Sequence, residues 1–144
     1  MANRRRQIVN AIAELIKVNL TGNSPYLTDI YDNVKARQVF WDEVSDYPFI
    51  CVYSGQEIRE YLPGDFKWSF LTVNIRIYVN EENAEEKLED IFQDLEYLLD
   101  NNNDLVVDGN DLSTDIRILS LSTDEGLLDP LGVGEVTLEI RYEV

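Results

Sequence analysis

A chain of 144 residues with 44% hydrophobic content can form one core, and it is too short for two ordinary domains. Its formal net charge is −16, it has no histidine, and eight Tyr, five Phe and two Trp exclude a disordered acidic tail. Residues 1–37 carry six Lys/Arg against three Asp/Glu, whereas residues 38–144 carry six against twenty-five. So acidic a chain repels a phosphate backbone, which excludes a conventional DNA-binding protein.

The N-terminal segment predicts one helix. Apolar side chains recur at helical spacing between residues 4 and 19, as in Ile8, Ile12 and Ile16, and the turn formers from Gly22 to Pro25 end the pattern. A weakly patterned strand follows at residues 34–40. Residues 41–48 are polar and turn-like.

The next segment predicts a long β-hairpin over residues 49–79. Residues 49–53 form an apolar run, and in residues 66–79 apolar side chains at odd positions from Leu71 to Val79 alternate with polar ones. A turn at residues 62–65 separates the two strands. The single cysteine, Cys51, lies in the first run, so we expect a buried thiol and no internal disulfide.

The second half predicts one more helix and further strands. Asn83 is positioned as an N-cap with Glu86 three residues on, and residues 84–99 carry one clean apolar face that three asparagines end. We then expect a short strand at 105–107, a turn at 108–109, a strand at 115–121 and a loop at 123–134. The last ten residues alternate strictly between apolar and polar.

The expected fold is therefore α+β: a single domain spanning residues 1–144, with a mostly antiparallel sheet, two helices packed on it and a long β-hairpin. No apolar run approaches the roughly 20 residues of a membrane span, and the N-terminus does not resemble a secretory signal. We expect a protein that folds in the cytoplasm without a membrane contact.

The sequence offers no catalytic set, so we expect a binding protein with no cofactor. It contains no Ser/His/Asp or Cys/His set, no phosphate-binding glycine loop and no zinc spacing. Asp100, Asn102 and Asp104 have the first spacings of a calcium loop, but Leu105 stands where glycine is needed and Asp111 where glutamate is needed. We expect a solvated helix end there, and no metal.

Two surface features allow more than one interpretation. The acidic face of the 84–99 helix is either an ordinary solvated face or a surface turned toward DNA that must pass without adhering. Tyr61, Phe66, Trp68 and Phe70 around the hairpin are either a docking surface or a local core.

The layout resembles the tail terminator, or tail completion, proteins of long-tailed bacteriophages. The segments that carry the resemblance are the helix beginning Arg5-Arg6-Gln7-Ile8-Val9, the strand Phe49 to Tyr53 after Tyr47-Pro48, the helix Ala84 to Leu99, the run Ser122 to Pro130 with Gly134, and the closing strand Ile140 to Val144. The resemblance implies a structural virion protein of the tail and neck, assembled in the host cytoplasm as a hexameric ring on the tail tube. Such a ring stops tube polymerisation, meets the neck or connector protein, and lets DNA through without specific binding.

Within that scheme we predict three groups of site residues. Tube docking is assigned to Arg59, Tyr61, Phe66 and Trp68; a subunit or neck interface to Arg4, Arg5, Arg6, Asp124, Glu125 and Asp129; and the lining of an acidic DNA channel to Glu85, Glu89, Asp90 and Asp94. Two alternatives remain. One is another neck protein, such as a head-tail stopper, and the other is an acidic DNA mimic that inhibits a host DNA-binding protein.

Overall fold

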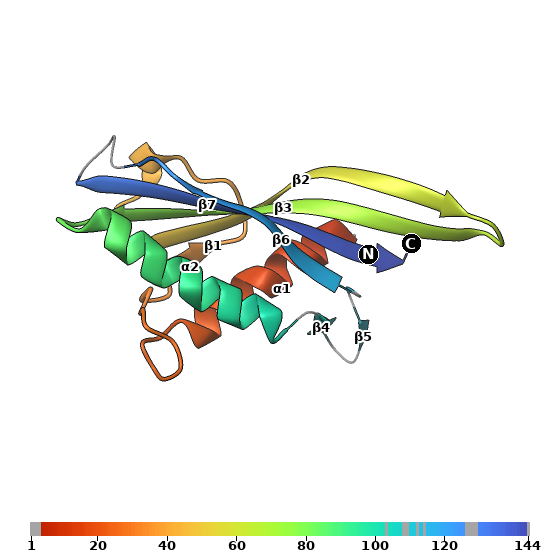
Figure 1. Ribbon diagram of the computed structural model, residues 1–144, viewed down its shortest axis with the longest axis horizontal. Coiled ribbons are helices and arrows are strands. Elements are labelled where there is room, and N and C mark those ends of the chain that lie inside the picture. Colours follow the sequence, from red (N-terminus) through yellow and green to blue (C-terminus); the bar gives the residue numbers. More distant parts are fainter. Residues whose placement is uncertain are drawn as a thin grey trace.

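The computed structural model describes residues 4–102, 104–107, 110–111, 113, 115–125 and 130–143. Two helices and a sheet of long strands dominate the chain (Figure 1). In chain order the elements are α1 (Arg4–Asn19), β1 (Val34–Lys35), the 3-10 turn η1 (Trp41–Glu43), β2 (Phe49–Leu62), β3 (Phe66–Asn80), α2 (Ala84–Asp100), β4 (Val106–Val107), β5 (Asn110–Asp111), β6 (Asp115–Thr123) and β7 (Leu131–Glu143).

The main sheet has five strands in the order β1-β2-β3-β7-β6. Every neighbouring pair is antiparallel except the short β1, which runs parallel to β2. Strands β2 and β3 form the long hairpin, and β4 pairs with β5 in a separate two-stranded ribbon. The predicted α+β class with a mostly antiparallel sheet is thereby confirmed.

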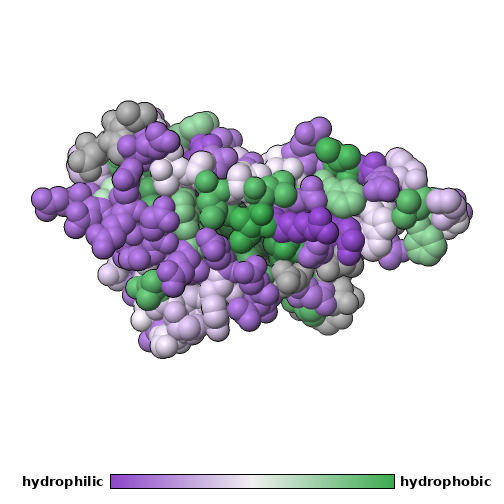
Figure 2. Space-filling model, viewed as in Figure 1, coloured by the Kyte–Doolittle hydropathy of each residue, from purple (hydrophilic) through white to green (hydrophobic). Residues whose placement is uncertain are grey.

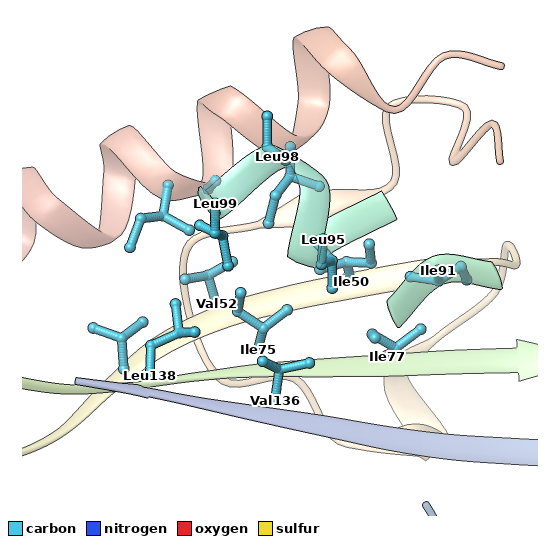
Figure 3. Packing of buried hydrophobic residues seen from close by; sticks show 14 of the residues in the cluster. Ile50, Val52, Ile75, Ile77, Ile91, Leu95, Leu98, Leu99, Val136 and Leu138 are labelled. Carbon is cyan, nitrogen blue, oxygen red and sulfur yellow. The ribbon is translucent and has the colours of Figure 1, made fainter. Parts of the chain in front are cut away.

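Both helices pack on one face of the sheet, which we call the helix face (Figure 1). The stripe of α1 buries Ile8, Ile12 and Ile16, while α2 buries Leu88 and Leu95 among others. Figure 3 shows aliphatic side chains of α2 packed over those of β2, β3 and β7; the labelled residues are Ile91, Leu95, Leu98 and Leu99 of α2, Ile50 and Val52 of β2, Ile75 and Ile77 of β3, and Val136 and Leu138 of β7. Because α1 contacts β1 and β2 whereas α2 contacts β6 and β7, the helices lie toward opposite edges of the sheet.

Close packing of α2 on β7 depends on glycine. A Cβ placed on Gly132 would lie 2.8 Å from the Cβ of Ala84 and 2.9 Å from a methyl group of Val79. On the same strand, a Cβ on Gly134 would lie 2.9 Å from the ring of Phe92. The start of β7 therefore lets the first turns of α2 approach the sheet backbone.

The alternation predicted for β3 and β7 is confirmed, with one exception on the opposite face, which we call the open face. Tyr78 was expected among the polar residues, but it is buried with Val39 and Cys51. Its hydroxyl donates a hydrogen bond to the carbonyl oxygen of Val39 at 2.7 Å. The segment before β2 folds over this end of the open face and covers it.

Some predicted boundaries were wrong. The strand expected at 34–40 is only two residues long, and β7 begins at Leu131, which shortens the loop expected at 123–134. Asn83 is the N-cap of α2 but makes no side-chain cap bond. The turn predicted at 108–109 lies outside the described residues. None of the described helices is long and apolar enough to cross a membrane.

Candidate functional site

The outer half of the β2–β3 hairpin projects from the body of the molecule (Figure 1). Strand β3 is paired with β7 only as far as Trp68, and the tip around the turn at Pro63 to Asp65 extends past that point. On its other side, β2 is paired with β1 only at Ile50 and Cys51. The tip is thus a two-stranded ribbon whose two edges are not paired with other strands of the sheet.

A β-bulge decides which side chains share a face of this ribbon. Pairing shifts register between Ser54 and Glu57, so the alternation of β2 is inverted beyond the bulge. Before it, Ile50 and Val52 lie on the helix face; after it, Ile58 lies on the open face, opposite Phe70.

The open face of the hairpin is largely apolar, with the exposed Glu60 opposite Trp68. Ile58 and Phe66 have 57% and 54% of their surface exposed. Trp68 is partly exposed on the same face, and the guanidinium of Arg141 lies 4.7 Å from its ring centroid. We call this set the hairpin strip; its members are Ile58, Leu62, Phe66, Trp68 and Phe70. Sequence reasoning missed Ile58 and Leu62.

The other two predicted docking residues lie on the helix face. Tyr61 pairs with Lys67, whose ammonium group lies 5.5 Å from the tyrosine ring centroid, and Arg59 pairs with Ser69. The structure therefore brings all four predicted residues to one hairpin, but it separates Arg59 and Tyr61 from Phe66 and Trp68.

Glu57 connects the base of the hairpin to the start of α1. Its carboxylate lies 3.2 Å from Arg5 and 3.3 Å from Arg59, and it accepts a hydrogen bond from the hydroxyl of Tyr142. Burial alone would raise the pKa of Glu57, but the tyrosine hydrogen bond and the two arginine charges lower it. Arg4 lies over the Tyr142 ring, 5.5 Å from its centroid. Arg5 thus holds α1 to the hairpin and Arg4 holds it to β7, whereas their assignment to a subunit interface stays a prediction.

A basic groove runs beside α1 at the β1–β2 edge of the sheet. It has a volume of about 620 Å³, and no acidic side chain is found among its described lining residues. The nearest acids flank it: Glu57 beside Arg5, and Glu43, 3.5 Å from Arg37. The lining consists of Arg5, Arg6, Val9, Asn10, Ala36, Arg37, Gln38, Tyr53 and Ser54.

The acids of α2 differ sharply in exposure. Glu85 and Glu89 are exposed and Asp90 is half-buried, but Asp94 retains only 2% of its surface. The Asp94 carboxylate accepts hydrogen bonds from the backbone N–H groups of Leu27 and Thr28, both at 2.9 Å, and from the Thr28 hydroxyl. The prediction that Asp94 lines a channel was wrong, because this carboxylate fastens the loop after α1.

The remaining acids of α2 point in two directions. Asp94, together with Tyr97 packed edge-on against Tyr26, marks the flank of α2 that faces the loop after α1. At about 100° per residue, Glu85 and Glu89 fall on the opposite flank, toward β6. Glu86 and Asp90 fall between the flanks, on the crown that faces away from the sheet. Figure 2 shows hydrophilic side chains over this side of the molecule.

The open face of the sheet carries charges of both signs. Arg76 pairs with Glu135 at 3.1 Å, and Arg117 pairs with Asp115 at 2.9 Å. Arg141 adds a further positive charge on β7. On the helix side α2 alone carries seven acids against one lysine, so negative charge is most concentrated there.

The end of β6 and the start of β7 lie at the end of the sheet opposite the hairpin tip (Figure 1). Asp124 is held by its backbone N–H, which donates to the carbonyl oxygen of Val133 at 2.9 Å, and its carboxylate accepts from the Val133 N–H at 3.2 Å. Glu125 is exposed. Asp129, the third acid predicted here, lies outside the described residues.

The described residues offer surfaces for binding. No group of three His, Cys, Asp or Glu side chains among them is placed to hold a metal ion. In the calcium-like segment, Asn102 donates its amide to the carbonyl oxygen of Leu98 at 2.8 Å, as a side-chain cap at the end of α2. The features that stand out are the hairpin strip, the basic groove and the acidic helix.

Comparison with known proteins assigns the family. Residues 2–144 match the family described as "Bacteriophage Tail Tube Terminator Protein". The chain is also 31% identical over 152 aligned positions to the tail tube terminator protein p142 of Escherichia phage T5, covering 98% of this chain and 94% of that protein. The chain belongs to the bacteriophage tail tube terminator family, and the resemblance read from the sequence is confirmed. It is a structural component of the phage tail.

Proposed function

We propose that this protein assembles as a ring, a hexamer as the resemblance implies, on the last ring of tail tube subunits. There it blocks further addition of subunits and presents its other end to the neck or connector protein. DNA passes through the ring without specific binding. The ring occupies the junction of tail and neck in the virion and is assembled in the host cytoplasm. It acts by binding alone.

The observation that carries this proposal is the hairpin strip. Phe66, at the tip, and Ile58, nearer the body of the molecule, keep more than half of their surface exposed on one face of this hairpin. Exposed apolar side chains gathered on one face are typical of a protein-binding surface. The strip is suited to the apolar contact that docking on the tube end requires.

Tube assembly in vitro tests the docking role. Purified tube protein is polymerised with this protein present, and tube lengths are measured by negative-stain electron microscopy. Phe66→Ser should abolish length control, and the matched variant Tyr61→Ser, an exposed aromatic near the same turn on the other face, should retain it. Equal loss in both variants would contradict docking by one face, and length control in both would remove the hairpin from the contact.

The neck contact belongs to the opposite end of the molecule. Phe40 and Trp41 are 53% and 61% exposed there. The segment that bears them packs through Val39 against a cluster that also includes Val133, which is hydrogen-bonded to Asp124. Trp41→Ser should therefore yield tails of normal length that fail to join filled heads. Tails that join heads normally would contradict the neck assignment.

The crown of α2 is proposed as the DNA-facing surface. Helix geometry puts Asp90, predicted for the channel, and its neighbour Glu86 on the side of α2 that turns away from the sheet. On the open face, by contrast, Glu135 and Asp115 pair with arginines. Uncompensated negative charge keeps DNA from adhering. Glu86→Gln with Asp90→Asn should preserve assembly and slow DNA ejection from virions, measured by dye release. The control pair Glu139→Gln and Glu143→Gln, on the open face, should leave the rate of ejection unchanged. Slower ejection in the control pair alone would place the sheet against DNA.

A further inference from the structure

Two chemically complementary surfaces lie at opposite edges of the sheet. The first is the basic groove, which α1 and β2 form at the β1–β2 edge. The second is at the β6 edge, where the outer flank of α2 meets β6, and we call it the α2–β6 surface. Its exposed members are Glu85, Glu89, Leu119 and Leu121.

The α2–β6 surface has the composition of an interface. Leu119 and Leu121 are 54% and 41% exposed on an edge strand, and Figure 2 shows an apolar patch over the region of β6 and β7. Leu121 pairs with Val136, which places it on the helix face beside α2, next to the flank that carries the two glutamates. The one cation close by on β6, Arg117, is paired with Asp115. An apolar centre with an acidic rim results.

The rim of the basic groove has the opposite charge. Arg6 and Arg37 line it. At its margin Arg37 pairs with Glu43 and Arg5 with Glu57. Tyr53 supplies an apolar wall, and the guanidinium of Arg76 lies 5.5 Å from its ring centroid. In a chain with a net charge of −16, two copies repel each other over most of their surfaces. A groove with a basic rim is where an acidic surface of a second copy can approach with a gain of electrostatic energy.

We propose that the basic groove of one copy binds the α2–β6 surface of the next. Because the two surfaces differ and lie at opposite edges of the sheet, the contact is head-to-tail and repeats from subunit to subunit until it closes a ring. The inference rests on the ring of the proposed function and names its subunit contact. It leaves the hairpin tip and the crown of α2 uncovered, so they stay available to the tube and to DNA.

Charge reversal tests the contact. Loss of rings in each variant alone, with recovery in their mixture, cannot result from misfolding of the variants. The groove variant carries Arg6→Glu and Arg37→Glu, and spares Arg5 because Arg5 holds Glu57. The flank variant carries Glu85→Arg and Glu89→Arg. Each variant alone sets like charges against each other in every contact, so its ring population in native mass spectrometry should fall about tenfold or more. In a mixture, the groove of each variant meets a flank of opposite charge on the other variant. The two should therefore form rings that contain equal numbers of each.

Controls separate the possible failures. Lys17→Glu with Lys67→Glu makes the same change in net charge outside the groove and should leave the ring intact. Circular dichroism and a thermal melt verify that each variant folds. Suppose that the wild type forms rings. If each variant alone also forms rings, or if the mixture of the two does not assemble, the proposed contact is wrong but the proposed ring is not contradicted. If the wild type forms no ring, alone or on purified tubes, the proposed function itself fails.

Discussion

Replacing Asp94 should destabilise the fold far more than replacing any exposed acid of α2. In Asp94→Ala the backbone N–H of Thr28 loses its acceptor in a buried position, and the Thr28 hydroxyl and the Leu27 N–H lose theirs nearby. A buried donor without a partner costs about 1–3 kcal/mol, and each lost hydrogen bond of the others contributes about 1 kcal/mol. The expected loss is about 3 kcal/mol, or a fall in Tm of roughly 10 °C for a chain of this size.

Thermal unfolding followed by circular dichroism measures this loss. Asp94→Asn should fall between alanine and wild type, because an amide keeps one acceptor oxygen but turns a donor toward an N–H group. The control Glu89→Ala, exposed on the same helix, should change stability by less than about 0.5 kcal/mol. A fall in Tm of less than about 2 °C for Asp94→Ala would refute the structural role of this carboxylate.

Three further predictions concern other parts of the fold. Glu57→Gln should lower stability at pH 7 by about 1–3 kcal/mol, measured by urea unfolding, because it loses two arginine partners. The pKa of Glu57 is lowered in the folded state, so the gap to wild type should close as the pH falls below about 4, and a constant gap would contradict the assignment. Gly132→Ala should cost about 1–3 kcal/mol because its Cβ meets Ala84, and an unchanged Tm would show that α2 can shift. Burial raises the pKa of the Cys51 thiol, so a thiol reagent should modify it only after denaturant is added, and rapid labelling of the native protein would disprove its burial.

Much of the architecture follows from local patterns. The two helices, the hairpin and the helix-facing residues of β3 and β7 could be predicted because a core face imposes its own period on the sequence. The same holds for the charge imbalance between the N-terminal segment and the rest of the chain. These features need only neighbours within a few residues, and so a single sequence reveals them.

The functional surfaces depend on contacts between distant segments. If side chains alternated along β2 without interruption, Arg59 and Tyr61 would lie on the same face as Phe66 and Trp68. The bulge after Ser54 puts them on the other face. No residue in this segment of the sequence predicts that register shift. Combined with the position of the turn, a known bulge would have identified Ile58 as a member of the strip.

The acids of α2 illustrate the same division. The sequence established that the helix is amphipathic and acidic, and it grouped Asp94 with the acids of the polar face. Only the tertiary structure decided that Asp94 is buried, because its partners Leu27 and Thr28 are more than sixty residues away in the chain. Composition determines how much charge a protein carries, but the packing of distant segments determines which charges face solvent and can reach another subunit or DNA.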